Sequence, residues 1–250
     1  MVEVEAPLGA QHFAALDAAF DDAIASLRIG AEPLTVLFSG GVDSSTLAIA
    51  VRDLPELELL TIGVRGCRDE SAARSAAETL GMRSTFAAVD SELVLAALER
   101  YAAELRGARR PARAVAVALA LAFENASHQR VVAAQGIDEL FLGYHHFRGL
   151  DEAASRRRVQ EDLDAVNGRE WPRAVALGRA THHEVRAPFL DPRWITTVES
   201  IAIAERVPGA LGKELFRAWA RHRGVPDAIA ARPKRAFQYG SGIHPLLGGR

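Results

Sequence analysis

Residues 39–45 read Ser39-Gly40-Gly41-Val42-Asp43-Ser44-Ser45 and directly follow the apolar run Leu34-Thr35-Val36-Leu37-Phe38. The apolar run begins after Pro33 and predicts a strand buried on both faces, with a helix expected from about Ser44 to Val51. Two glycines let the backbone approach an anion, while hydroxyls and the helix N-terminus supply hydrogen-bond donors. Because open parallel sheets bind ligands at the carboxyl ends of their strands, this stretch predicts a phosphate-binding loop.

Asp43 adds a negative charge that a simple phosphate site would not need. A divalent cation that bridges the carboxylate to phosphate oxygens would explain it. The loop lacks the Gly-Lys-Ser/Thr ending of a Walker sequence, so it is a different type of phosphate loop. We expect a nucleotide site that includes a metal, built from Ser39, Gly40, Gly41, Asp43, Ser44 and Ser45.

Strands and helices alternate through the first half of the chain, after an amphipathic helix over residues 11–28. This alternation predicts an α/β fold with a parallel sheet, right-handed crossovers and helices on both faces. Beyond the first strand, we expect strands at residues 58–64, 85–89 and 131–134, and helices at 70–80, 91–105 and 111–125.

The second half of the chain predicts a mainly helical lobe, followed by a loop from Arg232. Its expected helices lie at about 151–165, 172–180, 193–205 and 210–223. We expect an N-terminal helix in residues 1–30, a nucleotide-binding core in 31–150 and a helical lobe in 151–250. The lobe would complete the site, and all three parts would form one compact domain.

The amino-acid composition of the chain argues against several classes of protein and of site. The 250 residues are 49% hydrophobic and 25% charged, as in ordinary globular proteins. A formal charge of -2 gives no electrostatic case for binding nucleic acid or a membrane surface. The single cysteine, Cys67, excludes an intrachain disulfide and a cysteine zinc site. Because no apolar run is long enough for a bilayer and no signal peptide is evident, we expect a cytoplasmic protein.

Two of the 30 basic residues are lysines, Lys213 and Lys234. Arginine cannot replace a compact ammonium that must enter a tight site as a point charge. Two explanations of the low number of lysines are about equally good before any motif is considered. One is high-GC coding, and the other is a functional need for lysine at these positions.

Five segments resemble motifs of a known family. The 39–45 loop resembles the pyrophosphate loop of the N-type ATP pyrophosphatases, and the others resemble the asparagine synthetase C-terminal domain. They follow the family's order over about residues 30–243. Residues 136–144 resemble the family pattern Gly-x-Asp-Glu-x-Phe-x-Gly-Tyr, and residues 184–191 resemble Glu-x-Arg-x-Pro-Phe-Leu-Asp. Residues 213–217 resemble Lys-x-Leu-Leu-Arg, and residues 232–237 resemble Arg-x-Lys-x-x-Phe.

The resemblance implies an adenine nucleotide alpha hydrolase-like fold that uses ATP and Mg²⁺. It implies that Asp43 and Asp138 hold the Mg²⁺, and two carboxylates with phosphate oxygens are a normal shell for that ion. Lys234 would stabilise charge during adenylation and amide formation, and Lys213 would lie near the pyrophosphate. The nucleotide site would also include the backbone of Leu37, the side chain of Ile62, and Gly136.

Two positions depart from the family pattern. Val2 follows Met1, where the family's glutaminase domain begins with a nucleophilic cysteine. Nitrogen is therefore expected from free ammonia, another amine or a partner chain such as a separate glutaminase. Gln135 occupies the place of a glutamate that acts as base, or of a tyrosine in β-lactam-forming relatives, and glutamine cannot accept a proton at neutral pH. Either Glu139 or His145 takes the proton, or the substrate differs.

The implied activity is an amide-forming ligase that adenylates a carboxylate, with aspartate as one candidate, and transfers the acyl group to ammonia or an amine. One alternative is an adenylating sulfurtransferase of the tRNA-thiolating kind, which would need a further cysteine or a basic RNA surface. The other is a non-catalytic nucleotide-binding subunit, which Gln135 favours and the retained Asp43, Asp138 and Lys234 disfavour. Away from the site, Arg186 and Asp191 are expected to form an ion pair around the turn at Pro188.

Overall fold

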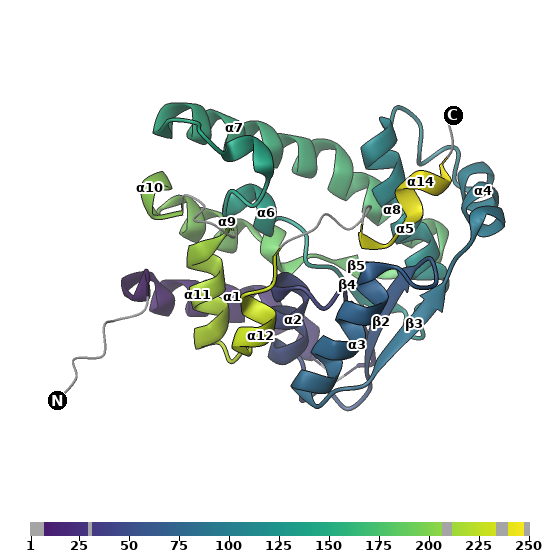
Figure 1. Ribbon diagram of the computed structural model, residues 1–250, viewed down its shortest axis with the longest axis horizontal. Coiled ribbons are helices and arrows are strands. Elements are labelled where there is room, and N and C mark those ends of the chain that lie inside the picture. Colours follow the sequence, from purple (N-terminus) through teal and green to yellow (C-terminus); the bar gives the residue numbers. More distant parts are fainter. Residues whose placement is uncertain (1–7, 30–31, 207–211, 234–239, 248–250) are drawn as a thin grey trace.

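In the part of the chain that the structure describes, five parallel strands form one sheet in the order β3-β2-β1-β4-β5 (Figure 1). The computed structural model describes residues 8–29, 32–206, 212–233 and 240–247. The strands are β1 Leu34–Leu37, β2 Leu57–Gly63, β3 Ser84–Ala88, β4 Arg130–Val132 and β5 Glu184–Arg186. The parallel sheet predicted from the alternating pattern is confirmed.

Strand β1 lies at the centre, where Val36 is aligned with Leu59 of β2 on one side and with Val132 of β4 on the other. The chain first adds β2 and β3 outward from β1, and then returns to place β4 on the opposite side. The order of the strands therefore reverses between β1 and β4. Open α/β sheets bind ligands in the crevice at such a point.

Helices cover both faces of the sheet, as predicted (Figure 1). Helix α5 contains the longest apolar run but has 15 residues, and no helix in the described ranges could span a membrane. The helices are α1 Phe13–Arg28, α2 Val42–Ala50, α3 Arg68–Leu80, α4 Ser91–Arg100, α5 Arg110–Glu124, α6 Ile137–Leu140, α7 Glu152–Ala165, α8 Trp171–Ala180, α9 Pro192–Glu199, α10 Ile203–Arg206, α11 Glu214–His222, α12 Asp227–Ala230 and α14 Ile243–Leu246. A π-helical segment, Val166–Glu170, joins α7 to α8.

Two apolar cores lie on opposite faces of the sheet. Leu34 and Val36 face one core, which they share with α1, α2, α3, α9 and α11. Ile62 and Val131 face the other, which they share with α4, α5, α8 and α14. Burial on both faces explains why β1 reads as a continuous apolar run instead of an alternating one.

The structure corrects three expectations about the second half. Residues 184–186 form the edge strand β5, which the sequence did not predict, because only Val185 of its three residues is buried. The helix expected over 193–205 is two helices, α9 and α10, separated at residues 200–202. The tail expected to be loop contains the short helix α14. Pattern analysis misses elements of three or four residues because they span only about one period of a helix, or fewer than two periods of a strand.

The expected ion pair between Arg186 and Asp191 is also wrong. Arg186 instead pairs with Glu184 on its own strand, at 2.7 Å between Nε and Oε1. Asp191 accepts a hydrogen bond from the backbone N–H of Arg193 at 2.8 Å and thereby caps α9. An aspartate directly before a helix satisfies an otherwise unpaired N–H, which explains the preference.

Candidate functional site

A cavity of about 310 Å³ opens at the carboxyl ends of β1, β2 and β4, where the order of the strands reverses. A larger groove of about 720 Å³ runs beside the edge strand β5, but none of the predicted site residues that the structure describes lines it. We therefore assign the chemistry to the smaller cavity. The predicted residues that line it are Leu37, Ser39, Asp43, Ser44, Ile62, Gly136, Asp138 and Glu139.

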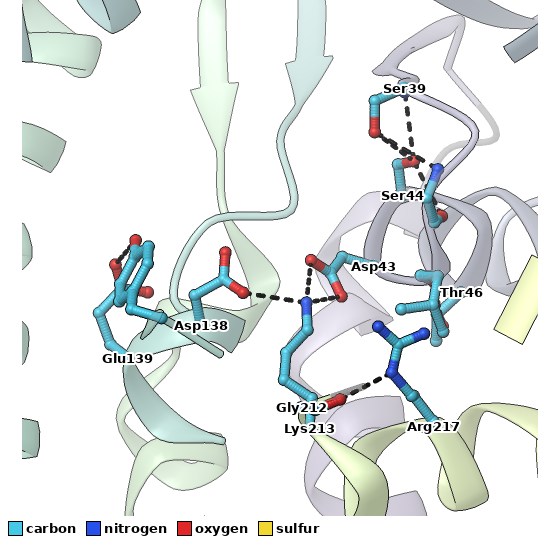
Figure 2. Close-up of polar contacts among 12 residues, drawn as sticks. Ser39, Asp43, Ser44, Thr46, Asp138, Glu139, Gly212, Lys213 and Arg217 are labelled. Carbon is cyan, nitrogen blue, oxygen red and sulfur yellow. Dashed lines mark hydrogen bonds and ion pairs between the residues drawn. The ribbon is translucent and has the colours of Figure 1, made fainter. Parts of the chain in front are cut away.

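The 39–45 loop forms one wall of this cavity. Gly40 has a φ of +67°, and a Cβ there would overlap the backbone of Ala72, so the tight turn requires glycine. The Ser44 hydroxyl is 3.3 Å from the backbone nitrogen of Ser39 and 3.4 Å from the Ser39 hydroxyl (Figure 2). These contacts are longer than the usual 2.7–3.0 Å. Both hydroxyls can therefore turn toward a better acceptor such as a phosphate oxygen.

Asp43 and Asp138 lie on either side of the Lys213 ammonium (Figure 2). Lys213 Nζ is 2.7 Å from each carboxylate oxygen of Asp43 and 3.0 Å from Oδ1 of Asp138. Burial disfavours the ammonium, but the carboxylates of Asp138 and Asp43 outweigh it and raise the pKa of Lys213 above its usual value. Lys213 is therefore a cation at neutral pH.

These contacts test whether the two aspartates could hold a metal. Asp43 comes from the first turn of α2 and Asp138 from that of α6, so the two follow neighbouring strands. Their oxygens already meet around a single cationic atom, the Lys213 nitrogen. Carboxylates that converge in this way, beside a cavity that could admit phosphate oxygens, fit the ligand preference of Mg²⁺.

Buried arginine contacts support the phosphate loop and Lys213 from behind. Arg217, which is fully buried, donates from Nε to the carbonyl of Gly212 at 2.7 Å and from Nη1 to the carbonyl of Arg232 at 2.9 Å. Arg232 in turn donates to the carbonyl of Gly40 at 3.0 Å. Hydrogen bonds thus hold Arg232, just before Lys234, against both α11 and the phosphate loop.

A second polar pair lies at another wall of the cavity. Tyr144 donates a hydrogen bond to Oε1 of Glu139 at 2.6 Å, and Gln135 lines the same cavity. Burial raises the pKa of Tyr144 well above its usual value, and the carboxylates of Glu139 and Asp138 raise it further. Tyr144 therefore keeps its proton and donates the hydrogen bond, which the Glu139 carboxylate accepts.

The other predicted site residues lie elsewhere. Gly40 and Gly41 shape the loop without lining the cavity, and Ser45 is fully buried in α2. Lys213 lies behind the two aspartates and does not line the cavity. Lys234 is outside the described residues, so its role stays a prediction.

Two further carboxylates that the sequence did not single out also line the cavity. Asp69 lies in the first turn of α3, which follows β2, and the rule that placed Asp43 and Asp138 after strands could have found it. Glu170 enters through the π-helical segment Val166–Glu170, which a helical pattern in the sequence does not reveal. Such segments occur often at functional sites.

Comparisons with known proteins extend this picture. The chain is 28% identical over 206 residues to a glutamine-hydrolysing asparagine synthetase of Brassica oleracea, covering 75% of this chain and 34% of that protein. It is 27% identical over 238 residues to the corresponding enzyme of Mesocricetus auratus, covering 88% and 42% respectively. The chain thus spans less than half the length of these relatives.

Among solved structures, NMN synthetase from Francisella tularensis superposes with a TM-score of 0.46 and 12% identity, covering 93% of this chain and 78% of that one. A similarity this low has no bearing on function. The family model for asparagine synthase matches residues 15–177 and 172–249, which is nearly the whole chain. The chain therefore belongs to the asparagine synthase family.

Proposed function

We propose that this chain is an ATP-dependent ligase that adenylates a carboxylate and transfers the acyl group to ammonia or another amine. One observation carries the proposal. A single cavity joins the serine-rich loop and the two converging carboxylates to the Glu139–Tyr144 pair. Phosphate binding and proton transfer can therefore take place in the same enclosed space.

In the first step, an oxygen of the substrate carboxylate attacks the α-phosphorus of ATP. The bond between the α-phosphorus and the oxygen that bridges to the β-phosphorus breaks, and pyrophosphate leaves. Ser39 and Ser44 would donate hydrogen bonds to phosphate oxygens, and Asp43 and Asp138 would hold Mg²⁺. When bound, Mg²⁺ supplies positive charge that offsets the charge of the leaving pyrophosphate.

In the second step, the amine nitrogen attacks the acyl carbon, the carbon–oxygen bond to AMP breaks, and one proton leaves the nitrogen. Gln135 cannot accept that proton. Glu139 is the carboxylate of the Glu139–Tyr144 pair in this cavity, and we assign it the proton. Lys234 would stabilise negative charge on the substrate in both steps, by resemblance to the family.

The two alternatives have less support. A sulfurtransferase would need a reactive cysteine at the cavity, but Cys67 does not line it, and burial raises the pKa of its thiol. A purely nucleotide-binding subunit would not need the Glu139–Tyr144 pair beside the phosphate loop. The formal charge of -2 gives no electrostatic reason to propose a nucleic-acid partner.

The experiment is to measure pyrophosphate and AMP released from Mg-ATP across a panel of carboxylates, including aspartate, with ammonium present. The proposal expects at least one carboxylate to yield pyrophosphate, AMP and an amide in equal amounts. Asp138→Asn should abolish this yield, whereas Asp164→Asn, which removes an exposed carboxylate on α7, should not. Formation of ADP and inorganic phosphate, or of AMP from a thiol-dependent reaction, would refute the proposal.

A further inference from the structure

Lys213 occupies an unusual place for a lysine beside a nucleotide site. Its side chain is 1% exposed and does not line the cavity, whereas the side chains of Asp43 and Asp138 are 21% and 18% exposed and do. The ammonium therefore lies behind the two carboxylates as seen from the cavity. A ligand in the cavity would meet the carboxylates first.

The position of this ammonium is fixed on several sides. A primary ammonium has three N–H donors, and the structure supplies three carboxylate oxygens within 3.0 Å. The backbone of Lys213 is left-handed, with a φ of +57°, and the preceding carbonyl is held by buried Arg217. A Cβ on Gly143 would overlap Asp138 Oδ1 and come within 2.9 Å of Lys213 Cδ, so the side chain passes through a gap that only glycine leaves.

The net charge of Asp43, Asp138 and Lys213 together decides which ligands the site attracts. Two carboxylates with one ammonium carry a net charge of -1, whereas two carboxylates alone would carry -2. Free divalent cations are attracted more strongly by the pair without the lysine. A metal–nucleotide complex, whose triphosphate remains negative after one divalent cation is bound, is repelled more strongly by that pair.

We propose that Lys213 is a positioning residue that acts through Asp43 and Asp138 as a fixed counter-ion, so that the site selects the metal–nucleotide complex over the free metal ion. The inference rests on the proposed function for the identity of the nucleotide. This role of Lys213 differs from direct contact with the pyrophosphate, because the ammonium is bound by carboxylate oxygens and shielded from the cavity.

This role predicts changes of opposite sign in Lys213→Met. The affinity for free Mn²⁺, measured without nucleotide by electron paramagnetic resonance, should rise about tenfold or more. The affinity for Mn²⁺ with α,β-methylene-ATP, measured by calorimetry, should fall about tenfold or more. Lys213→Met/Asp138→Asn has one carboxylate and no ammonium, so its net charge returns to -1 and its free Mn²⁺ affinity should fall back to the wild-type level or below.

Arg206→Met is the matched control, since it also removes a buried cation. Arg206 donates to the carbonyl of Leu140 at 3.0 Å and does not line the cavity. Both Mn²⁺ affinities should stay within about twofold of wild type. Circular dichroism reports folding, and Lys213→Gln, which keeps a polar side chain without the charge, replaces Lys213→Met if that variant does not fold.

The outcomes separate this inference from the proposed function. A fall of both affinities in the Lys213 variants would mean that the lysine only maintains the structure, and would overturn the inference. An unchanged free Mn²⁺ affinity with weaker nucleotide binding would mean direct contact with phosphate, and would overturn it too. Wild-type protein that binds no Mn²⁺–nucleotide would instead refute the proposed function itself.

Discussion

The cavity has a phosphate end at Asp43 and Asp138 and an acceptor end at Glu139, and the surroundings of the carboxylates differ between the two ends. At the phosphate end, the negative charges of Asp43 and Asp138 meet the positive charge of Lys213, which is fixed before any ligand arrives. At the acceptor end, the carboxylate of Glu139 accepts a hydrogen bond from Tyr144, whose hydroxyl stays neutral because burial raises its pKa. We infer that the phosphate end supplies preorganised charge, and that the acceptor end supplies a carboxylate to take a proton.

The largest effect is expected from Asp43 and Asp138, the carboxylates of the phosphate end that we propose hold the metal. Asp43→Asn and Asp138→Asn should each lower pyrophosphate release more than about 100-fold, because each removes a ligand and a charge at the transition state. Steady-state pyrophosphate release at saturating ATP measures this, with Asp164→Asn as the control. Turnover within about threefold of wild type in either variant would place the metal elsewhere.

Lys234 offers the next largest effect and belongs to the same end by resemblance alone. Lys234→Ala should lower turnover by about tenfold or more while changing ATP affinity less, since a charge that meets developing negative charge acts mainly in the transition state. Lys234→Arg should fail as well, because a planar guanidinium cannot replace a compact ammonium. Turnover within about threefold of wild type in both variants would indicate a residue without a catalytic role.

Changes at the acceptor end should separate the two half-reactions. Glu139→Gln removes the carboxylate and should slow acyl transfer to ammonium by about 100-fold, within the range for general bases. Carboxylate-dependent exchange of labelled pyrophosphate into ATP should continue, because adenylation does not use that proton acceptor. Tyr144→Phe, which keeps the carboxylate, should have a smaller effect on acyl transfer. Equal loss of both half-reactions in Glu139→Gln would show that the two ends are not separable.

The smallest effect is expected from packing behind the phosphate end. Gly143→Ala places a Cβ against Asp138 and Lys213 and should destabilise the fold by about 1–3 kcal/mol, as overpacking usually does. Gly168→Ala is the control, since a Cβ there meets nothing within 4 Å. Thermal melts followed by circular dichroism compare the two. Equal melting temperatures for Gly143→Ala and Gly168→Ala would mean that Lys213 and Asp138 are loosely held.

The phosphate end could be predicted from the sequence because local signals place it. A buried strand, a Gly40-Gly41 turn and a helix start are consecutive in the chain, and parallel strands bring Asp43 and Asp138 to one edge. The alternation of strands and helices likewise predicts the sheet. These features depend on neighbouring residues and on one general rule of topology.

Other features could not be predicted because they depend on contacts distant in sequence. Lys213 lies behind Asp43, 170 residues earlier in the chain, and no periodicity records that placement. Glu170 reaches the cavity through a π-helical turn, and β5 has one buried residue. Asp191 looked like a partner for Arg186 but caps α9 instead, because a helix N-terminus competes for the same carboxylate.

The proposed reaction begins when a carboxylate oxygen attacks the α-phosphorus of ATP. The direct measurement uses the carboxylate identified by the pyrophosphate screen, labelled with ¹⁸O in its carboxyl group, with ammonium as acceptor and mass analysis of the nucleotide products. We expect the AMP formed to carry one ¹⁸O atom in its phosphate and the pyrophosphate to carry none. Label in inorganic phosphate formed together with ADP, or AMP without label, would contradict it.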